Sequence, residues 1–330
     1  MNIAKKLCTI GTLLITAFCL TGCGSNDNNT AKVNIGYFNN VTHAQALLMK
    51  SEESLEKALG ADIKVNWTSF NAGPAEVEAL FSEDIDIGYI GPVPAVNANV
   101  KSNGDVMILT GATKGGAIVV KNKDSQINSI SDFAGKNVAI PQIGNTQHLS
   151  LLKLLSDNNL KPVTEGGDVN ITAVSNADVA NVMERGDIDA AIVPEPWGAT
   201  LEEAGSELFL DYDEIYMDGN YDVAVVVVRK EFLEKHPDIV EAFLNEHQAA
   251  SERLTSDTEN ALQTINNELQ NATGKSLSDS IIQKAFDRII IDTQLNKESI
   301  LGFAKIGVEQ KLMSDVPNES DLFVNTESQK

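Results

Sequence analysis

The sequence predicts an α/β fold of two lobes, each a mainly parallel sheet flanked by helices, with a ligand cleft between them. Three observations predict this fold. Short apolar runs with β-type spacing alternate with helical runs along most of the chain, which is typical of parallel α/β units. One pattern of helix, strand and turn occurs once in each half of the chain. Turns made of glycine and helix-starting residues follow the strands in both halves.

The elements follow from composition and spacing, taken in chain order. The expected strands are 33–38, 63–70, 85–91, 106–112, 117–121, 137–144, 169–175, 188–196, 208–211 and 223–228. The expected helices are 44–59, 75–81, 149–155, 177–184, 197–204, 231–254, 257–271 and 278–290.

The repeated pattern compares AEVEALFSEDIDIGYIGPVP, beginning at Ala75, with ADVANVMERGDIDAAIVPEP, beginning at Ala177. In each copy a helix ends, an Asp-Ile-Asp step opens an apolar strand, and Pro-x-Pro stops that strand where the next helix begins. The copies are interpreted either as an internal repeat or as two independent uses of the same strand and helix pattern. Both interpretations predict two similar lobes.

The chain is expected to return to the first lobe with the apolar strand 223–228, because long helices follow it. Crossovers at 113–116 and 218–222 then form a hinge, and no Pro-rich or Ser-rich linker separates the lobes. The expected boundaries are 32–113 for the first part of lobe 1, 114–218 for lobe 2, and 219–330 for the return strand and C-terminal helices.

The N-terminus has the pattern of an export signal. Lys5 and Lys6 precede the apolar stretch 7–20, which is too short to span a bilayer. The phrase LTGC, ending at Cys23, resembles the lipobox of bacterial lipoproteins. We expect a signal peptide at 1–22 and a lipidated cysteine with a flexible tether at 23–31; the alternative is a plain secretory signal with an incidental cysteine.

Charge and cysteine content exclude several function classes. The chain has 47 acidic and 25 basic residues, and loss of Lys5 and Lys6 with the signal takes the formal net charge from −22 to −24. An acidic chain without a basic stripe does not favour nucleic acid as a partner. Cleavage leaves Cys23 as the sole cysteine, so neither a disulfide nor a thiolate metal site is expected. The four histidines lack zinc-ligand spacing, and no cofactor is expected.

Four turns after strands are candidates for ligand binding, because helix N-termini at strand ends present unpaired amides. They are 36–43, 91–94, 144–148 and 194–197, two in each lobe. The candidate ligand-binding residues are Tyr37, Phe38, His43, Gly91, Pro92, Val93, Gly144, Asn145, Thr146, Gln147, His148, Glu195 and Trp197.

Several of these residues have more than one interpretation. His148 is a cap or packing residue, a wall of the ligand site, or a catalytic base. Trp197 either closes the cleft or is buried at a helix start. Tyr89 is either part of an apolar wall or a core tyrosine, and Lys114 is either a cation at the hinge or a solvated lysine.

The positions of the arginines narrow the possible classes of ligand. Arg185, Arg253 and Arg288 are expected in or at the ends of helices away from the four turns, whereas a carboxylate ligand usually needs a bidentate arginine. A weakly hydrated oxyanion held by amides and hydroxyls is therefore favoured. The chain has no GxSxG and no Walker A motif, so we expect a binding protein rather than an enzyme; a tethered hydrolase is the alternative.

Taken together, these features resemble the substrate-binding proteins of ABC importers, in particular the nitrate, taurine and aliphatic sulfonate family. The phrases that carry the resemblance are SDFAGKNVAIPQIGNTQHLSLLKLL, ADVANVMERGDIDAAIVPEPW, GYFNNVTHAQALL and IDIGYIGPVPA. The resemblance implies a type II periplasmic-binding-protein-like fold, an ABC permease and ATPase as partners, and a lipid-anchored monomer on the extracytoplasmic face.

The resemblance also implies that the turns at 144–148 and 91–94 hold the oxyanion and that Glu195 can meet an amine. Gln147 and the phrase PEPW depart from the family pattern. The family includes binders of nitrate, bicarbonate and pyrimidine, thiamine or riboflavin-like precursors, but an aromatic content of 5% favours a sulfonate. Glu195 either meets the amine of taurine or caps the helix at Trp197; we favour a simple sulfonate with Glu195 as the cap.

Overall fold

The computed structural model describes residues 31–325, which form one compact unit. The predicted signal peptide, Cys23 and nearly all of the predicted tether lie outside the described residues. Among the described residues, no helix is long and apolar enough to cross a membrane.

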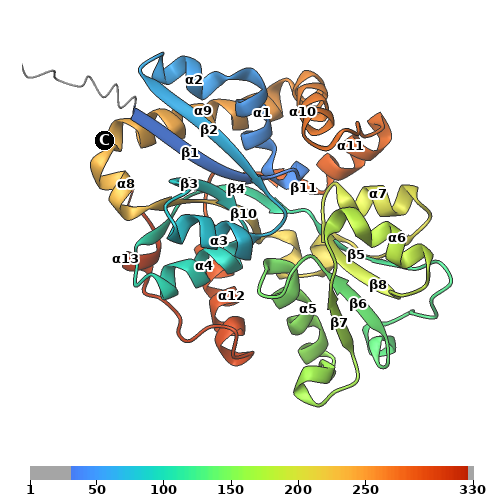
Figure 1. Ribbon diagram of the computed structural model, residues 1–330. Coiled ribbons are helices and arrows are strands. Elements are labelled where there is room, and N and C mark those ends of the chain that lie inside the picture. The colour runs from blue at the N-terminus through green and yellow to red at the C-terminus, as the bar shows by residue number, and fades with distance from the viewer. Residues whose placement is uncertain (1–30, 326–330) are drawn as a thin grey trace, which may run out of the picture. The chain divides into compact units, whose positions relative to one another are not determined.

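Two sheets organise the fold (Figure 1). The first has six strands in the order β11-β4-β10-β3-β1-β2, and the second has five in the order β7-β6-β8-β5-β9. The strands of the first sheet are β1 (Ala31–Phe38), β2 (Ile63–Phe70), β3 (Ile87–Ile90), β4 (Val106–Gly115), β10 (Asp222–Arg229) and β11 (Ile289–Ile291). The strands of the second are β5 (Ala117–Lys121), β6 (Asn137–Ile140), β7 (Asn170–Ala173), β8 (Ala190–Pro194) and β9 (Glu207–Leu210).

Most strands of each sheet run in one direction, as expected, with β10 and β11 reversed in the first sheet and β5 reversed in the second. β1 is parallel to β2 and β3, and β6 is parallel to β7 and β8, as strands joined by helical crossovers should be. β10 is antiparallel to β3 and β4, and β5 is antiparallel to β8 and β9. β5 and β10 are the strands that enter each sheet from the other lobe, and they run against their neighbours.

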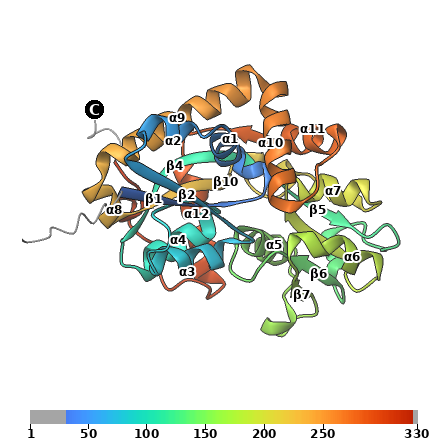
Figure 2. The same ribbon diagram turned by 45° about the horizontal axis from the view of Figure 1, so that its top comes forward.

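Helices cover both faces of the six-stranded sheet and flank the five-stranded one (Figures 1 and 2). The helices are α1 (Ala44–Glu52), α2 (Ser54–Leu59), α3 (Gly73–Phe81), α4 (Pro92–Lys101), α5 (Thr146–Asp157), α6 (Val179–Glu184), α7 (Trp197–Glu203), α8 (Lys230–Lys235), α9 (Pro237–Ser256), α10 (Thr258–Thr273), α11 (Asp279–Asp287), α12 (Lys297–Glu309) and α13 (Glu319–Leu322). α1, α9 and α10 pack together on one face, while α3, α4 and α12 lie on the other.

Three helical expectations need correction. The expected helix 44–59 is two helices, because Glu53 has the left-handed φ of 51° that ends α1. The expected helix 231–254 is also two, because Pro237 has no N–H to continue α8 and instead begins α9. The expected helix 278–290 ends at Asp287, since 289–291 form β11 against β4.

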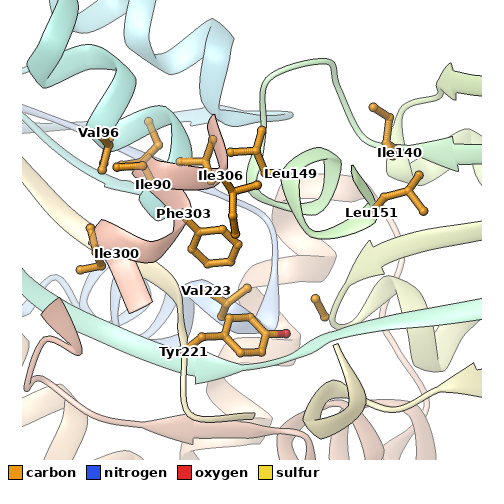
Figure 3. Packing of buried hydrophobic residues seen from close by; sticks show 14 of the residues in the cluster. Ile90, Val96, Ile140, Leu149, Leu151, Tyr221, Val223, Ile300, Phe303 and Ile306 are labelled. Atoms are coloured by element: carbon orange, nitrogen blue, oxygen red, sulfur yellow. The ribbon is translucent and has the colours of Figure 1, made fainter. Parts of the chain in front are cut away.

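A hydrophobic core continues from one lobe into the other. Helix α12, which sequence patterning did not predict, packs against α4 of the six-stranded lobe and α5 of the five-stranded lobe. Figure 3 shows Phe303 and Ile306 of α12 beside Leu149 of α5, with Val223 of β10 close by. Because Phe303 is fully buried, truncating it to alanine would cost about 3–5 kcal/mol. The C-terminal segment therefore contributes to both lobes.

Candidate ligand-binding site

A cavity of about 30 Å³ lies between the two lobes. Its lining residues are Phe38, Asn40, Thr42, His43, Asn71, Ala72, Gly73, Gly91, Pro94, Pro141, Asn145, Thr146, Gln147, Asn176, Pro194 and Val223. None of them is Asp, Glu, Lys or Arg. Amide, hydroxyl and imidazole groups therefore provide the polar lining.

The N-terminus of α5 supplies amides from the five-stranded lobe. Asn145 is the N-cap, and its Oδ1 accepts a hydrogen bond from His148 N at 2.9 Å. Its Nδ2 donates to Gln147 Oε1 at 3.1 Å. The N–H groups of Thr146 and Gln147 belong to the first turn, which has no intrahelical acceptor, at the positive end of a 12-residue helix. This geometry favours an anion.

The Thr146 side chain is buried, and its Oγ1 has no hydrogen-bond partner among the described residues. It lies against Gly91 of the opposite lobe, where an added Cβ would come within 2.4 Å of Oγ1. Buried hydroxyls are normally hydrogen-bonded, so an unpartnered one in a cavity wall indicates a place for a ligand atom. Any larger residue at position 91 would therefore clash with this hydroxyl.

The six-stranded lobe contributes fewer amides than the sequence suggested. Helix α4 begins with Pro92, and Pro94 follows two residues later, so Val93 has the only N–H among its first three residues. Asn40 and Asn71 of this lobe and Asn176 of the other also line the cavity, and each side-chain amide has donor and acceptor atoms. The Oδ1 atom of Asn176 is buried without a partner among the described residues.

Six of the predicted residues line the cavity, namely Phe38, His43, Gly91, Asn145, Thr146 and Gln147. The structure does not bring Tyr37, Pro92, Val93, Gly144, His148, Glu195 or Trp197 to its lining. Successive residues of a strand point to opposite faces, so Tyr37 packs edge-on against Trp67, with ring centroids 6.0 Å apart, while Phe38 reaches the cavity. Val93 is in the hydrophobic core.

His148 stabilises the turn that precedes α5. Its Nδ1 accepts a hydrogen bond from Gly144 N at 3.1 Å, and Gly144 has the left-handed φ of 84° that glycine adopts readily. Burial lowers the pKa of His148 to about 4. The ring lines a separate groove with Ile143, Leu152 and Val163. Of its three interpretations, the structure places His148 in the capping and packing role.

Glu195 is fully buried beside the cavity and has protein partners for both oxygens. Its Oε2 accepts from Ala199 N in the first turn of α7 at 2.9 Å, and its Oε1 accepts from Arg288 Nη1 at 2.9 Å. Arg288 was expected to lie away from the four turns, and this expectation is wrong. It follows α11, which packs on α7 of the other lobe (Figure 1).

Trp197 and Asn40 join the lobes next to the cavity. Trp197 Nε1, in the five-stranded lobe, donates to Asn40 Oδ1 at 2.8 Å. Since that bond uses the Asn40 oxygen, the Nδ2 group of Asn40 remains a donor for the cavity that this residue lines. Trp197 thus positions Asn40, which lines the cavity, and does not line the cavity itself.

His43 lies at the start of α1. Its Nδ1 accepts a hydrogen bond from Phe38 N at 3.1 Å, and its ring stacks on that of Phe38 with centroids 4.4 Å apart. Burial lowers the pKa of His43 to about 3. Tyr89 is a core tyrosine whose hydroxyl lies 2.7 Å from His247 Nδ1. Lys114 is buried and pairs with Asp292 at 2.7 Å.

Ten lining residues are absent from the list of candidate residues, although Asn40, Thr42, Pro94 and Pro194 lie within the candidate turns. The ten are Asn40, Thr42, Asn71, Ala72, Gly73, Pro94, Pro141, Asn176, Pro194 and Val223. Asn71 and Asn176 follow the ends of β2 and β7, which is the same signal that identified the four turns. Among the described residues, no group of three His, Cys, Asp or Glu side chains could hold a metal ion.

Two α/β lobes that enclose a polar cavity at helix N-termini have the architecture of a two-lobed binding-protein fold. The chain belongs to the NMT1-like family, which matches residues 26–267. It is 37% identical over 202 residues to the taurine-binding periplasmic protein of Escherichia coli (strain K12), covering 60% of this chain and 59% of that protein. It is 27% identical over 221 residues to a putative aliphatic sulfonates-binding protein of the same strain, covering 66% of each.

The fold is shared with a solved structure, the alkanesulfonate-binding protein SsuA from Xanthomonas axonopodis pv. citri bound to MOPS. The TM-score is 0.72 at 20% sequence identity, covering 89% of this chain and 96% of that one. The predicted two-lobed fold and the predicted family resemblance are confirmed. The sequence match to the two E. coli proteins spans 59% and 66% of their length, which is less than two thirds of each.

Proposed function

We propose that the protein is an extracytoplasmic substrate-binding lipoprotein of an ABC importer that captures a small aliphatic sulfonate and delivers it to a membrane permease. The observation that carries the proposal is an uncharged cavity at the N-terminus of α5, with the buried Thr146 hydroxyl lacking a partner among the described residues. The relatives named for taurine and aliphatic sulfonates support it.

The chemistry of the lining favours a sulfonate. A sulfonate is a weak base and a weakly hydrated anion, so neutral donors and a helix dipole can hold it without a cation. A carboxylate ligand would gain most from an arginine fork, and no arginine lines the cavity. A protonated amine would gain most from a carboxylate, yet both oxygens of Glu195 have partners. We therefore favour an alkanesulfonate without an amine over taurine.

Binding of nitrate, bicarbonate or a thiamine or pyrimidine precursor is the alternative within the same class of protein. The two rings in the lining, those of Phe38 and His43, stack on each other with centroids 4.4 Å apart, so they do not sandwich a flat ligand ring between them. A lipid-anchored hydrolase using the same cleft is the alternative from another class, and it predicts loss of substrate over time.

We propose that one lobe comprises residues 32–113 and 219–330 and that the other comprises residues 114–218. The two crossovers between them form a hinge. The chain leaves β4 at Gly115 and enters β5 at Ala117, and it returns after β9 to begin β10 at Asp222. Gly115 and Gly116 have φ of 70° and 69°, which only glycine adopts readily. We propose a monomer that closes on its ligand and partners a permease and an ATPase.

A ligand screen tests the function. Protein purified from expressing cells and dialysed free of ligand is titrated by calorimetry with ethanesulfonate, taurine, nitrate, bicarbonate and a thiamine precursor. We expect stoichiometric binding of ethanesulfonate, no product over time, and weaker binding of the other ligands. Preferential binding of nitrate or bicarbonate would replace the sulfonate assignment, and turnover of any ligand would refute the binding-protein role.

A further inference from the structure

His43 is the only imidazole in the lining of the inter-lobe cavity. It comes from the six-stranded lobe and shares the cavity with Thr146 and Gln147 of the other lobe. A role for His43 in ligand binding rests on the proposed function of this cavity, and it adds a chemical basis for ligand specificity.

The hydrogen bond from Phe38 N determines where the ring proton lies. A backbone N–H can only donate, so Nδ1 of His43 must hold its lone pair toward Phe38 N at 3.1 Å. A neutral imidazole carries one proton, which is therefore on Nε2. Stacking on Phe38 and burial of the side chain keep the ring in this orientation.

Among the described residues, no carboxylate pairs with the ring to stabilise a positive charge. Its ring neighbours are Phe38 and Tyr89, at centroid distances of 4.4 and 6.2 Å. Burial lowers the pKa of His43 to about 3, so the ring is neutral at physiological pH. Nε2 has no hydrogen bond within residues 31–325, and the ring lines the cavity, so its N–H is a free donor that a ligand atom can reach.

We propose that His43 is an obligate neutral hydrogen-bond donor to the sulfonate, with its Nε2–H facing an oxygen that the N-terminus of α5 also binds. An anion held by His43 from one lobe and by Thr146 from the other would join the lobes. The site would then select among oxyanions by the positions of its hydrogen-bond donors, because it carries no formal positive charge.

His148 provides a matched comparison. In both lobes a histidine at a helix start accepts a backbone N–H on Nδ1, from Phe38 for His43 and from Gly144 for His148. Only His43 lines the inter-lobe cavity. Substitution by Asn places an amide near Nδ1 and preserves the acceptor for the backbone, whereas Gln places its amide near Nε2 and preserves the donor.

The experiment uses protein purified from expressing cells and ethanesulfonate as the probe. Because the chain has four histidines, ¹⁵N-histidine spectra of the wild type and His43→Asn identify His43 by its missing signals. We expect an unprotonated Nδ1 and a protonated Nε2 without ligand, and a shift of the Nε2–H signal on binding. A protonated Nδ1 would overturn the assignment.

The affinity of each variant for ethanesulfonate is the second part of the test. We expect His43→Asn to fold but to bind ethanesulfonate more than about tenfold more weakly, as for loss of a hydrogen bond to a charged group. His43→Gln should bind more tightly than His43→Asn, and His148→Asn should lose less affinity than His43→Asn. Wild-type affinity in His43→Asn would overturn the ligand contact. Wild-type protein that binds neither ethanesulfonate nor taurine would instead overturn the proposed function, whatever the tautomer.

Discussion

Arg288 and Glu195, which are far apart in the sequence, form a buried ion pair across the two lobes, with Nη1 to Oε1 at 2.9 Å. The same nitrogen lies 2.6 Å from Glu202 Oε2 in α7. Gly116, at the first crossover, links their backbones, since its N–H donates to the Arg288 carbonyl and its carbonyl accepts from Glu195 N, each at 2.8 Å. The pair holds Glu195 away from the cavity and ties α11 to the five-stranded lobe.

Replacing Arg288 by Met should destabilise the protein by about 3–5 kcal/mol, because the buried carboxylate of Glu195 would lose its compensating charge. Urea unfolding measures the change. Arg185→Met is the control, since Arg185 and Asp187 form an exposed pair worth less than about 1 kcal/mol. Equal effects of the two substitutions would contradict a structural role for the Arg288 pair.

Glu195→Gln tests whether this carboxylate meets a ligand amine. Because both oxygens have protein partners, we expect a loss of stability of about 1–3 kcal/mol and an unchanged ratio of ethanesulfonate to taurine affinity. Calorimetric titration with both ligands measures the ratio. A selective loss of taurine affinity would show that Glu195 binds an amine.

Thr146→Val should weaken ethanesulfonate binding by about 1–3 kcal/mol, because a ligand oxygen would lose the hydroxyl and stay buried without a partner. The unliganded protein should keep its melting temperature or gain slightly, since the hydroxyl has no partner among the described residues. Thr258→Val is the control, because Thr258 also begins a helix but bonds Leu254 O at 2.8 Å. Unchanged affinity with a lowered melting temperature would make Thr146 a helix-start residue only.

Glu76 should make stability depend on pH. Its carboxyl is fully buried under Gly36 and Gly88, both oxygens lack partners within residues 31–325, and burial raises its pKa well above 4.5. The folded protein therefore holds this proton more tightly than the unfolded chain, and stability is lost as the pH rises above about 4.5.

The measurement is the difference in unfolding free energy between Glu76→Gln and the wild type. As the pH rises from about 5 to 8, the unfolding free energy of the variant should increase relative to that of the wild type, because glutamine does not ionise. Burial raises the pKa of Asp222 to about 6, but Asp222 is present in both proteins, so its contribution cancels in this difference. Glu78→Gln on the exposed face of α3 is the control and should show no shift. A difference that does not change with pH would mean that Glu76 ionises normally.

Cys23→Ser tests the lipid anchor. The domain should still fold, because residues 31–325 form a compact unit with their own cores, but it should leave the membrane fraction. Detergent-phase partitioning of wild type and variant measures the change. Retention of the variant in the detergent phase would refute acylation at Cys23.

The local part of the site was predictable. Asn145 and Thr146 stand between a strand end and an apolar helical repeat, and a helix start depends on residues within one turn of each other. Alternation along β1 also implies that Tyr37 and Phe38 cannot both face the cleft. Asn71 and Asn176 follow strand ends and could have been identified by the same signal.

By itself, the sequence determined the alternation of strands and helices, the two similar lobes and the helix N-terminus at Thr146, because these depend on propensities and patterns within a few residues. Only the tertiary structure decided that His43 rather than His148 lines the cavity, that Arg288 reaches Glu195, and that β5 and β10 run against their neighbours. Those outcomes involve contacts between elements far apart in the sequence, such as β10 with β3 and β4, and α11 with α7. Contacts between residues that are distant in sequence are set by the packing of whole elements, which no local pattern encodes.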